Sequence, residues 1–69
     1  MSPRQRADLV HRRSPDVLVL SSRDARRFVG SYPTEQAIHD HPAMSEYRLA
    51  HVASGEGAGC TYHLMLFRR

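Results

Sequence analysis

The chain has 69 residues, a formal net charge of +3 and a single cysteine, Cys60. This length provides for one small domain that buries only about 60% of its unfolded surface, and one cysteine excludes an intramolecular disulfide framework. No apolar run approaches the roughly 20 residues of a membrane-spanning helix, and the first residues lack the apolar segment of a signal peptide. We therefore expect a soluble chain, cytoplasmic if it stands alone.

The basic side chains are ten arginines with no lysine, and seven acidic residues are interleaved with them. Arginine binds phosphate as a planar fork, which makes it a good ligand for nucleic acids. However, a domain dedicated to nucleic acids carries a more concentrated positive charge, and a preference for arginine also reflects the base composition of a genome. The composition therefore leaves nucleic-acid binding open without favouring it.

Residues 1–14 are expected to form an arginine-rich helix or arm. Pro3 suits the first turn of a helix that runs to Arg13. Its apolar face is thin and consists of Ala7, Leu9 and Val10. Such a helix needs to dock on another element to be stable, because most helical stability in proteins comes from packing.

Residues 15–69 are expected to form a small α+β domain that begins with a strand at Val17–Leu20. This run is short, apolar without alternation and bounded by turn residues. The pattern is typical of a strand that is buried on both faces or lies at the centre of a sheet.

Two helices are predicted after this strand. Ser21, Ser22 and Asp24 provide a cap and a first-turn acid for a helix that runs to Val29 and ends at Gly30. Thr34 is positioned to cap a second helix at Glu35–Asp40, which Pro42 ends.

The last part of the chain predicts a β-hairpin around the glycine-rich segment 55–59. Pairing Ser54 with Gly59 leaves a four-residue loop, and it places Leu49 opposite Leu64. The same register sets Tyr47 opposite Leu66 and His51 opposite Tyr62. One face of the hairpin is then apolar (Tyr47, Leu49, Tyr62, Leu64 and Leu66), and the other is mixed and half exposed (Arg48, Ala50, Val52, His63, Met65 and Phe67). The glycines indicate a turn and not a phosphate-binding loop, because they open onto a strand and no Walker lysine follows.

Together the elements predict a β-α-β-β fold with a three-stranded mixed sheet and one helical layer, plus the N-terminal helix. The crossover at residues 21–45 is long enough to bring the chain back parallel to the first strand. We therefore expect Val17–Leu20 to pair in parallel with a strand of the hairpin.

Three segments carry a family resemblance: Pro15–Ser22, Tyr47–Leu49 and Tyr62–Arg69, which read PDVLVLSS, YRL and YHLMLFRR. This series is similar to the C-terminal soluble segment of polytopic membrane glycosyltransferases of the dolichyl-phosphate-mannose transferase type. In that family the catalytic acid and the lipid-phosphate site belong to the membrane part, and no residue here matches them. The resemblance thus implies a non-catalytic terminal domain or a detached relative of one, with no catalytic residue carried over.

A second hypothesis is a small zinc-binding module that uses His39, His41, Cys60 and His63. Histidine nitrogen and cysteine thiolate are the ligands that Zn²⁺ prefers, and a metal would help to stabilise so small a core. Against it, Cys60 and His63 point to opposite faces of a regular strand, because only even spacings share a face. The alternative is a set of surface or half-buried imidazoles with an inert cysteine. Cys60 also lacks the helix N-terminus that would activate it as a nucleophile.

A third hypothesis is nucleic-acid binding through Arg23, Arg26 and Arg27, which share one side of the predicted crossover helix. The alternative is a solvated helix face. Among all these hypotheses we favour a protein-interaction role, because the hairpin puts a strand at or near a sheet edge and exposed edges recruit partners. The expected partner is another protein or a second copy of the chain, bound through the hairpin edge.

Overall fold

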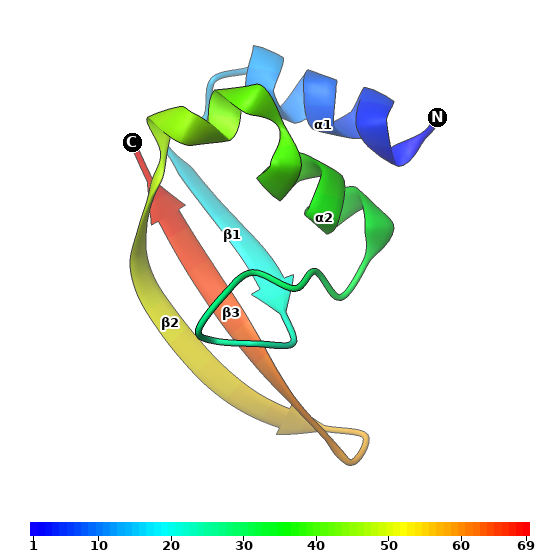
Figure 1. Cartoon of the computed structure of the whole chain (residues 1–69), viewed down its shortest axis with the longest axis vertical. Coiled ribbons are helices and arrows are strands. Elements are labelled where there is room, and N and C mark those ends of the chain that lie inside the picture. Colours follow the sequence, from blue (N-terminus) through cyan, green and yellow to red (C-terminus); the bar gives the residue numbers. More distant parts are fainter.

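The computed structural model describes residues 1–69 and contains two α-helices, a short 3₁₀ helix and three strands (Figure 1). In chain order these are α1 (Pro3–Arg12), β1 (Val17–Ser22), α2 (Pro33–Asp40), η1 (Pro42–Glu46), β2 (Arg48–Gly57) and β3 (Cys60–Arg68). The predicted α+β class and three-stranded sheet are confirmed. None of the helices has the length and apolar character that are needed to cross a bilayer.

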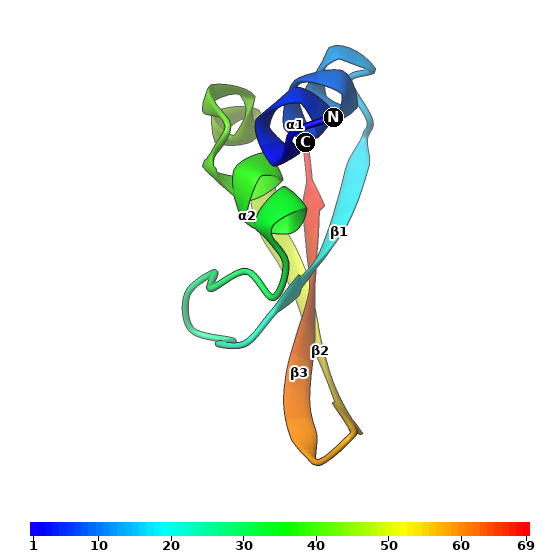
Figure 2. The ribbon, with the colours of Figure 1, turned by 90° about the vertical axis from the view of Figure 1, so that its right-hand side faces the viewer.

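Helix α1 begins at Pro3 as predicted and ends one residue early, at Arg12. A capping box fixes its start: the Gln5 N–H donates to Ser2 Oγ over 3.2 Å, and the Ser2 N–H donates to Gln5 Oε1 over 2.7 Å. The buried side chains of α1 are Ala7 and His11. The helix packs against α2 (Figure 2), which supplies the docking that its thin apolar face requires.

All strand pairs of the sheet are antiparallel, in the order β1-β3-β2. The predicted mixed sheet is therefore wrong. Strand β2 does run in the direction of β1, but β3 lies between them and pairs with both. This arrangement sets Leu18 opposite Phe67 and Leu20 opposite Met65, so the two most apolar segments of the chain lie side by side, where cross-strand contacts are favourable.

The hairpin turn is shorter than predicted, because Gly57 pairs with Cys60 and only Ala58 and Gly59 form the loop. Both loop residues have positive φ, +50° and +75°, which is the type I′ geometry that fits the right-handed twist of a hairpin. The predicted register is thus wrong by four positions: Leu64 lies opposite Ala53, Leu66 opposite His51 and Tyr62 opposite Gly55. Tyr62, Leu64 and Leu66 share one face, as alternate residues of a strand do, but the bulge sets Leu49 opposite Phe67, so Leu49 does not join them as predicted.

The predicted helix from Ser22 to Val29 does not form. Ser22 is fully buried, and its hydroxyl accepts the backbone N–H groups of Asp24 and Val29 over 3.2 and 3.1 Å. These bonds, together with an isolated bridge between Ser22 and Gly30, fold the segment into a closed loop. A serine hydroxyl can hydrogen-bond to nearby backbone groups, and here these bonds take the place of the backbone hydrogen bonds of a helix.

Helix α2 begins at Pro33, two residues before the predicted start, and its N-cap is Tyr32 in place of Thr34. Proline suits the first helical position because its missing N–H would be unpaired there. The helix ends at Asp40 as predicted, and the chain turns into η1 at Pro42.

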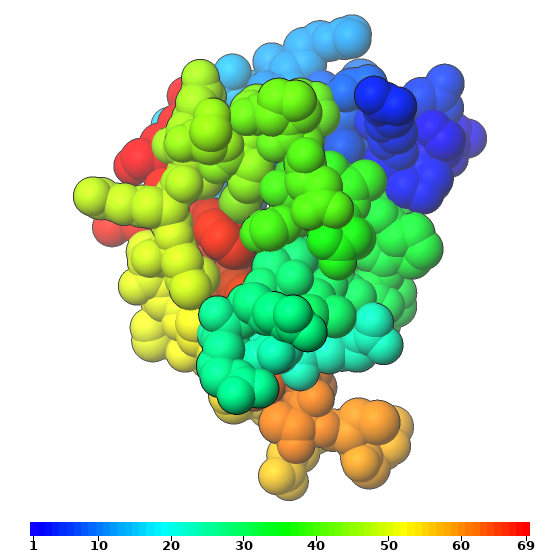
Figure 3. All heavy atoms as spheres, in the orientation of Figure 1, coloured from blue at the N-terminus to red at the C-terminus, as the bar shows by residue number.

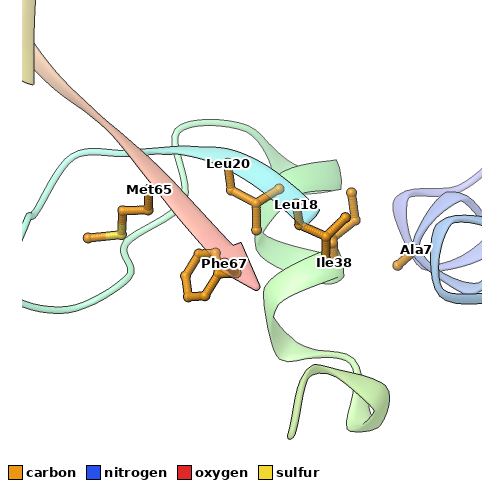
Figure 4. Close-up of a cluster of buried hydrophobic side chains, with 6 residues drawn as sticks. All are labelled: Ala7, Leu18, Leu20, Ile38, Met65 and Phe67. Atoms are coloured by element: carbon orange, nitrogen blue, oxygen red, sulfur yellow. The ribbon is translucent and has the colours of Figure 1, made fainter. Parts of the chain in front are cut away.

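The core lies on one face of the sheet, between the sheet and the helices (Figure 4). Its buried apolar side chains are Ala7, Leu18, Leu20, Ile38, Met65 and Phe67. Strand β1 is an edge strand and only alternate residues of it are buried, so neither expected alternative, a strand buried on both faces or a central strand, is right. The face of β3 that was expected to be mixed and half exposed contributes to the core.

Candidate interaction surface

The end of the outer β1 edge, at residues 21–23, is closed by the chain itself. The Ser21 N–H donates to the Glu35 carboxylate, and the Arg23 N–H donates to the Val29 carbonyl over 2.9 Å. The bridge between Ser22 and Gly30 lies between these two bonds. The end of β1 therefore has little backbone left for a partner.

The outer edge of β2 is open. None of the hydrogen bonds outside the regular helix and sheet ladders involves a backbone group of β2. The two-residue turn makes Gly57 and Cys60 a hydrogen-bonded pair, and such pairs alternate along an antiparallel ladder. The backbone groups of Val52, Ser54 and Glu56 consequently point away from β3, towards solvent.

The end of the hairpin projects beyond the rest of the molecule (Figure 3). Strand β1 pairs with β3 only from His63 to Arg68, so the hairpin beyond His63 has two strands alone. The Tyr62 ring covers Gly55 there, and a Cβ at Gly55 would lie 2.7 Å from ring atoms. A bulge between Leu49 and His51 interrupts β2 near its other end, which leaves the regular open edge at residues 52–57.

The sheet also has a face that no helix covers, which we call the open face. Its side chains are Val17, Val19 and Ser21 from β1, His51, Ala53 and Gly55 from β2, and Tyr62, Leu64, Leu66 and Arg68 from β3. Val17, Val19, Tyr62 and Leu64 are among the exposed large apolar residues of the chain. The sequence predicted that Tyr62, Leu64 and Leu66 share an apolar face, but it did not indicate that the helices leave this face uncovered.

The predicted metal ligands His39 and His41 have other partners. His39 stacks on Phe28 with ring centres 4.2 Å apart, and its Nδ1 lies 3.1 Å from Asp40 Oδ1. His41 Nε2 lies 2.8 Å from Asp8 Oδ1, while its Nδ1 accepts the Ala43 N–H over 3.1 Å. Hydrogen bonds from the Gln36 amide and then from His39 lower the pKa of Asp40 below its ordinary value.

Cys60 and His63 lie on the hairpin and not beside these histidines. Cys60 is exposed at the start of β3, and His63 Nδ1 lies 3.0 Å from Ser54 Oγ across the hairpin. No group of three or more His, Cys, Asp or Glu side chains is arranged to hold a metal ion. The four predicted ligands therefore do not come together in one cluster, and zinc binding by them stays a prediction.

The arginines of the predicted nucleic-acid patch lie in the closed loop after β1, where the expected helix is absent. Arg26 and Arg27 both approach Asp24, with Nε to carboxylate oxygen distances of 3.5 and 3.6 Å. The Arg26 N–H donates to Asp24 Oδ1 over 2.8 Å and lowers the pKa of Asp24, and both guanidinium groups act in the same direction. Arg23 makes no ion pair, and nucleic-acid binding by the three residues stays a prediction.

Comparisons of the chain with protein-family models, with curated proteins and with solved structures found no match.

Proposed function

We propose that this chain is a non-catalytic interaction domain that binds an extended segment of a protein partner along the open edge of β2. The observation that carries the proposal is the difference between the two sheet edges. Strand β2 has ten residues and no backbone partner on its outer side within the chain. An added strand would receive main-chain hydrogen bonds from Val52, Ser54 and Glu56, which is the usual source of affinity in strand addition.

Natural edge strands are commonly protected by charge, proline, bulges or short length. In β2 the bulge and Arg48 protect only the first residues. The part from Val52 to Gly57 contains no proline and has Glu56 as its single charge. Neither proline nor an accumulation of charge would therefore oppose the pairing of a partner strand with this segment.

Substitution of Ser54 tests the proposal. Ser54→Pro removes an outward N–H, and proline is tolerated at such a position of an edge strand. Ser54→Ala is the matched control, because both variants lose the contact with His63 and only the proline loses the outward donor. The probe is a display library of unstructured peptides as long as β2.

We expect selected peptides to shift the amide NMR signals of Val52, Ser54 and Glu56. Their affinity should fall about tenfold in Ser54→Pro, which corresponds to a lost hydrogen bond and a blocked approach, and it should be kept in Ser54→Ala. Peptides that bind equally to both variants, or a library that yields no binder, would contradict the proposal.

The relation to the C-terminal segment of membrane glycosyltransferases is a further part of this proposal, which the comparisons do not test. It is supported by the PDVLVLSS and YHLMLFRR segments, which form β1 and β3. Sequencing of the gene's upstream region provides the test. A continuous reading frame with several membrane spans favours the relation, and an unrelated upstream gene contradicts it.

A further inference from the structure

The positive charge of the chain is concentrated at its start. Residues 1–14 contain four of the ten arginines and a single acid, Asp8, so their side chains carry a formal charge of +3. Residues 15–69 contain six arginines and six acids and are neutral. The whole formal net charge of the protein therefore belongs to the segment that forms α1.

Part of this charge forms one outward surface of α1, which we call the basic face. Ala7 and His11 are the buried side chains of the helix, and Leu9, on the opposite side, is 38% exposed. Three exposed arginines lie three or four positions from Leu9 and therefore share its side of the helix. The basic face consists of Arg6, Arg12 and Arg13.

No carboxylate of the chain neutralises the basic face. Its arginines make no ion pair. The acid of this segment, Asp8, is directed to His41 instead, with Oδ1 2.8 Å from Nε2. Arg4 is not part of the face, because it lines a hollow between α1 and α2 together with Asp40. The guanidinium groups of the basic face are therefore available to an anionic partner.

The chemistry of the basic face favours phosphate groups of a nucleic acid. A pI above 9 with arginines clustered along one helix is typical of a nucleic-acid contact, and the pI of this chain is about 9.8. A membrane fits less well, because an interfacial helix inserts a broad apolar side into the lipid. In α1 that side is already used: Ala7 is buried, and Val10 packs against the core.

The geometry of α1 favours double-stranded DNA as the nucleic acid. The major groove of DNA is about 12 Å wide and admits an α-helix, whereas the major groove of double-stranded RNA is too narrow. Arg6 and Arg13 are separated by about 10 Å along the helix axis. Their long side chains can consequently reach phosphates on both sides of the DNA groove.

We propose that the basic face of α1 binds the phosphates of double-stranded DNA across the major groove, without preference for a base sequence. The amide side chain nearest to the face is Gln5, and its Oε1 already accepts the Ser2 N–H over 2.7 Å. Helix α1 and the hairpin turn lie at opposite ends of the molecule (Figure 1). DNA binding is therefore independent of the proposed strand binding at β2, and one chain has room for both partners.

The test is a fluorescence-anisotropy titration of a labelled DNA duplex, two helical turns long, at increasing salt concentration. Three phosphate contacts predict that the logarithm of the association constant falls with that of the salt concentration with a slope of about −2.7. Arg6→Gln and Arg13→Gln should each reduce this slope by about 0.9 and weaken binding roughly tenfold at low salt.

Arg23→Gln is the matched control. It removes the same charge from an exposed arginine without an ion pair, beyond the other end of β1. Its salt dependence should equal that of the wild type. Arg6→Lys should keep the slope because it keeps the charge, and all variants should keep the far-ultraviolet circular dichroism of the wild type, since glutamine, lysine and arginine have similar helix propensities.

Four results would overturn the proposal. These are no binding of the duplex at low salt, an equal loss in Arg23→Gln and Arg6→Gln, equally tight binding of an RNA duplex of the same sequence, and binding of anionic phospholipid vesicles in place of DNA. The two proposed surfaces are tested separately by Ser54→Pro, which should bind DNA as the wild type does. Conversely, Arg6→Gln should keep the affinity for peptides selected at β2.

Discussion

The two edge strands of the sheet differ in whether their outward backbone groups have hydrogen-bond partners within the chain. At the β1 edge, the Ser21 N–H is bound by Glu35, and the loop after Ser22 returns to pair at Gly30. At the β2 edge, the outward backbone groups of Val52, Ser54 and Glu56 have no hydrogen-bond partner within the chain. The comparison teaches that an edge is closed by a few well-placed side chains, and that a chain of 69 residues leaves the second edge available.

The closure of the β1 edge depends on one buried hydroxyl, and its removal has the largest expected effect. Ser22→Ala leaves the N–H groups of Asp24 and Val29 without their acceptor. We expect the free energy of unfolding to fall by about 1–3 kcal/mol, the cost of an unsatisfied buried donor. Urea denaturation measures this change.

Ser21→Ala is the control, because the Ser21 hydroxyl makes no hydrogen bond and only its backbone contributes to the edge. Hydrogen exchange should become faster at Val29 in Ser22→Ala and stay unchanged at Val52. Equal stability of the two variants would show that the hydroxyl does not close the edge.

The hairpin that presents the β2 edge can be made more stable at its turn. Ala58 has a φ of +50°, a conformation that costs a residue with a Cβ about 1–2 kcal/mol. Ala58→Asn gives the Asn-Gly pair that type I′ turns favour, so we expect a gain of about 0.5–1 kcal/mol, part of the cost of the alanine conformation. Thermal denaturation measures the gain.

Gly59→Ala provides the opposite case, since Gly59 has a φ of +75° and no neighbouring atom limits the space for a Cβ. It should lower the unfolding temperature through backbone strain alone. A stabilising Gly59→Ala, or a destabilising Ala58→Asn, would be inconsistent with the type I′ turn.

Acid should destabilise the loop at the β1 edge. This effect is expected to be smaller than those of the Ser22 and hairpin-turn substitutions. The pKa of Asp24 is lowered from its ordinary 3.8, so the carboxylate stabilises the folded loop above that pH. This contribution is lost as the pH falls through the lower, folded value. The Arg26 amide signal, which reports the bond to Asp24 Oδ1, should move with a midpoint below 3.8.

Asp24→Asn keeps an oxygen acceptor for the Arg26 N–H but does not titrate. Its Arg26 signal should therefore be independent of pH in this range. A midpoint at or above the ordinary value in the wild type would contradict the lowered pKa.

Local patterns of the sequence determined most of the secondary structure. Pro3 and Pro42 mark the start of α1 and the end of α2, because proline fixes φ and removes a donor. The alternation within the hairpin placed Tyr62, Leu64 and Leu66 on one face although the register was wrong. The local signal for a helix start at Ser22 was wrong. The Ser22 hydroxyl accepts the N–H of Val29, seven residues along the chain, and no helix begins there.

The tertiary structure decided which strands are neighbours, which face is buried and which edge stays open. The run Val17–Leu20 predicted a central strand or one buried on both faces, and the insertion of β3 between β1 and β2 placed it at the edge. Either face of β3 is apolar enough for a core, and the helices bury the face that carries Met65 and Phe67. These choices depend on contacts between residues far apart in the chain, which the local periodicity of a sequence does not contain.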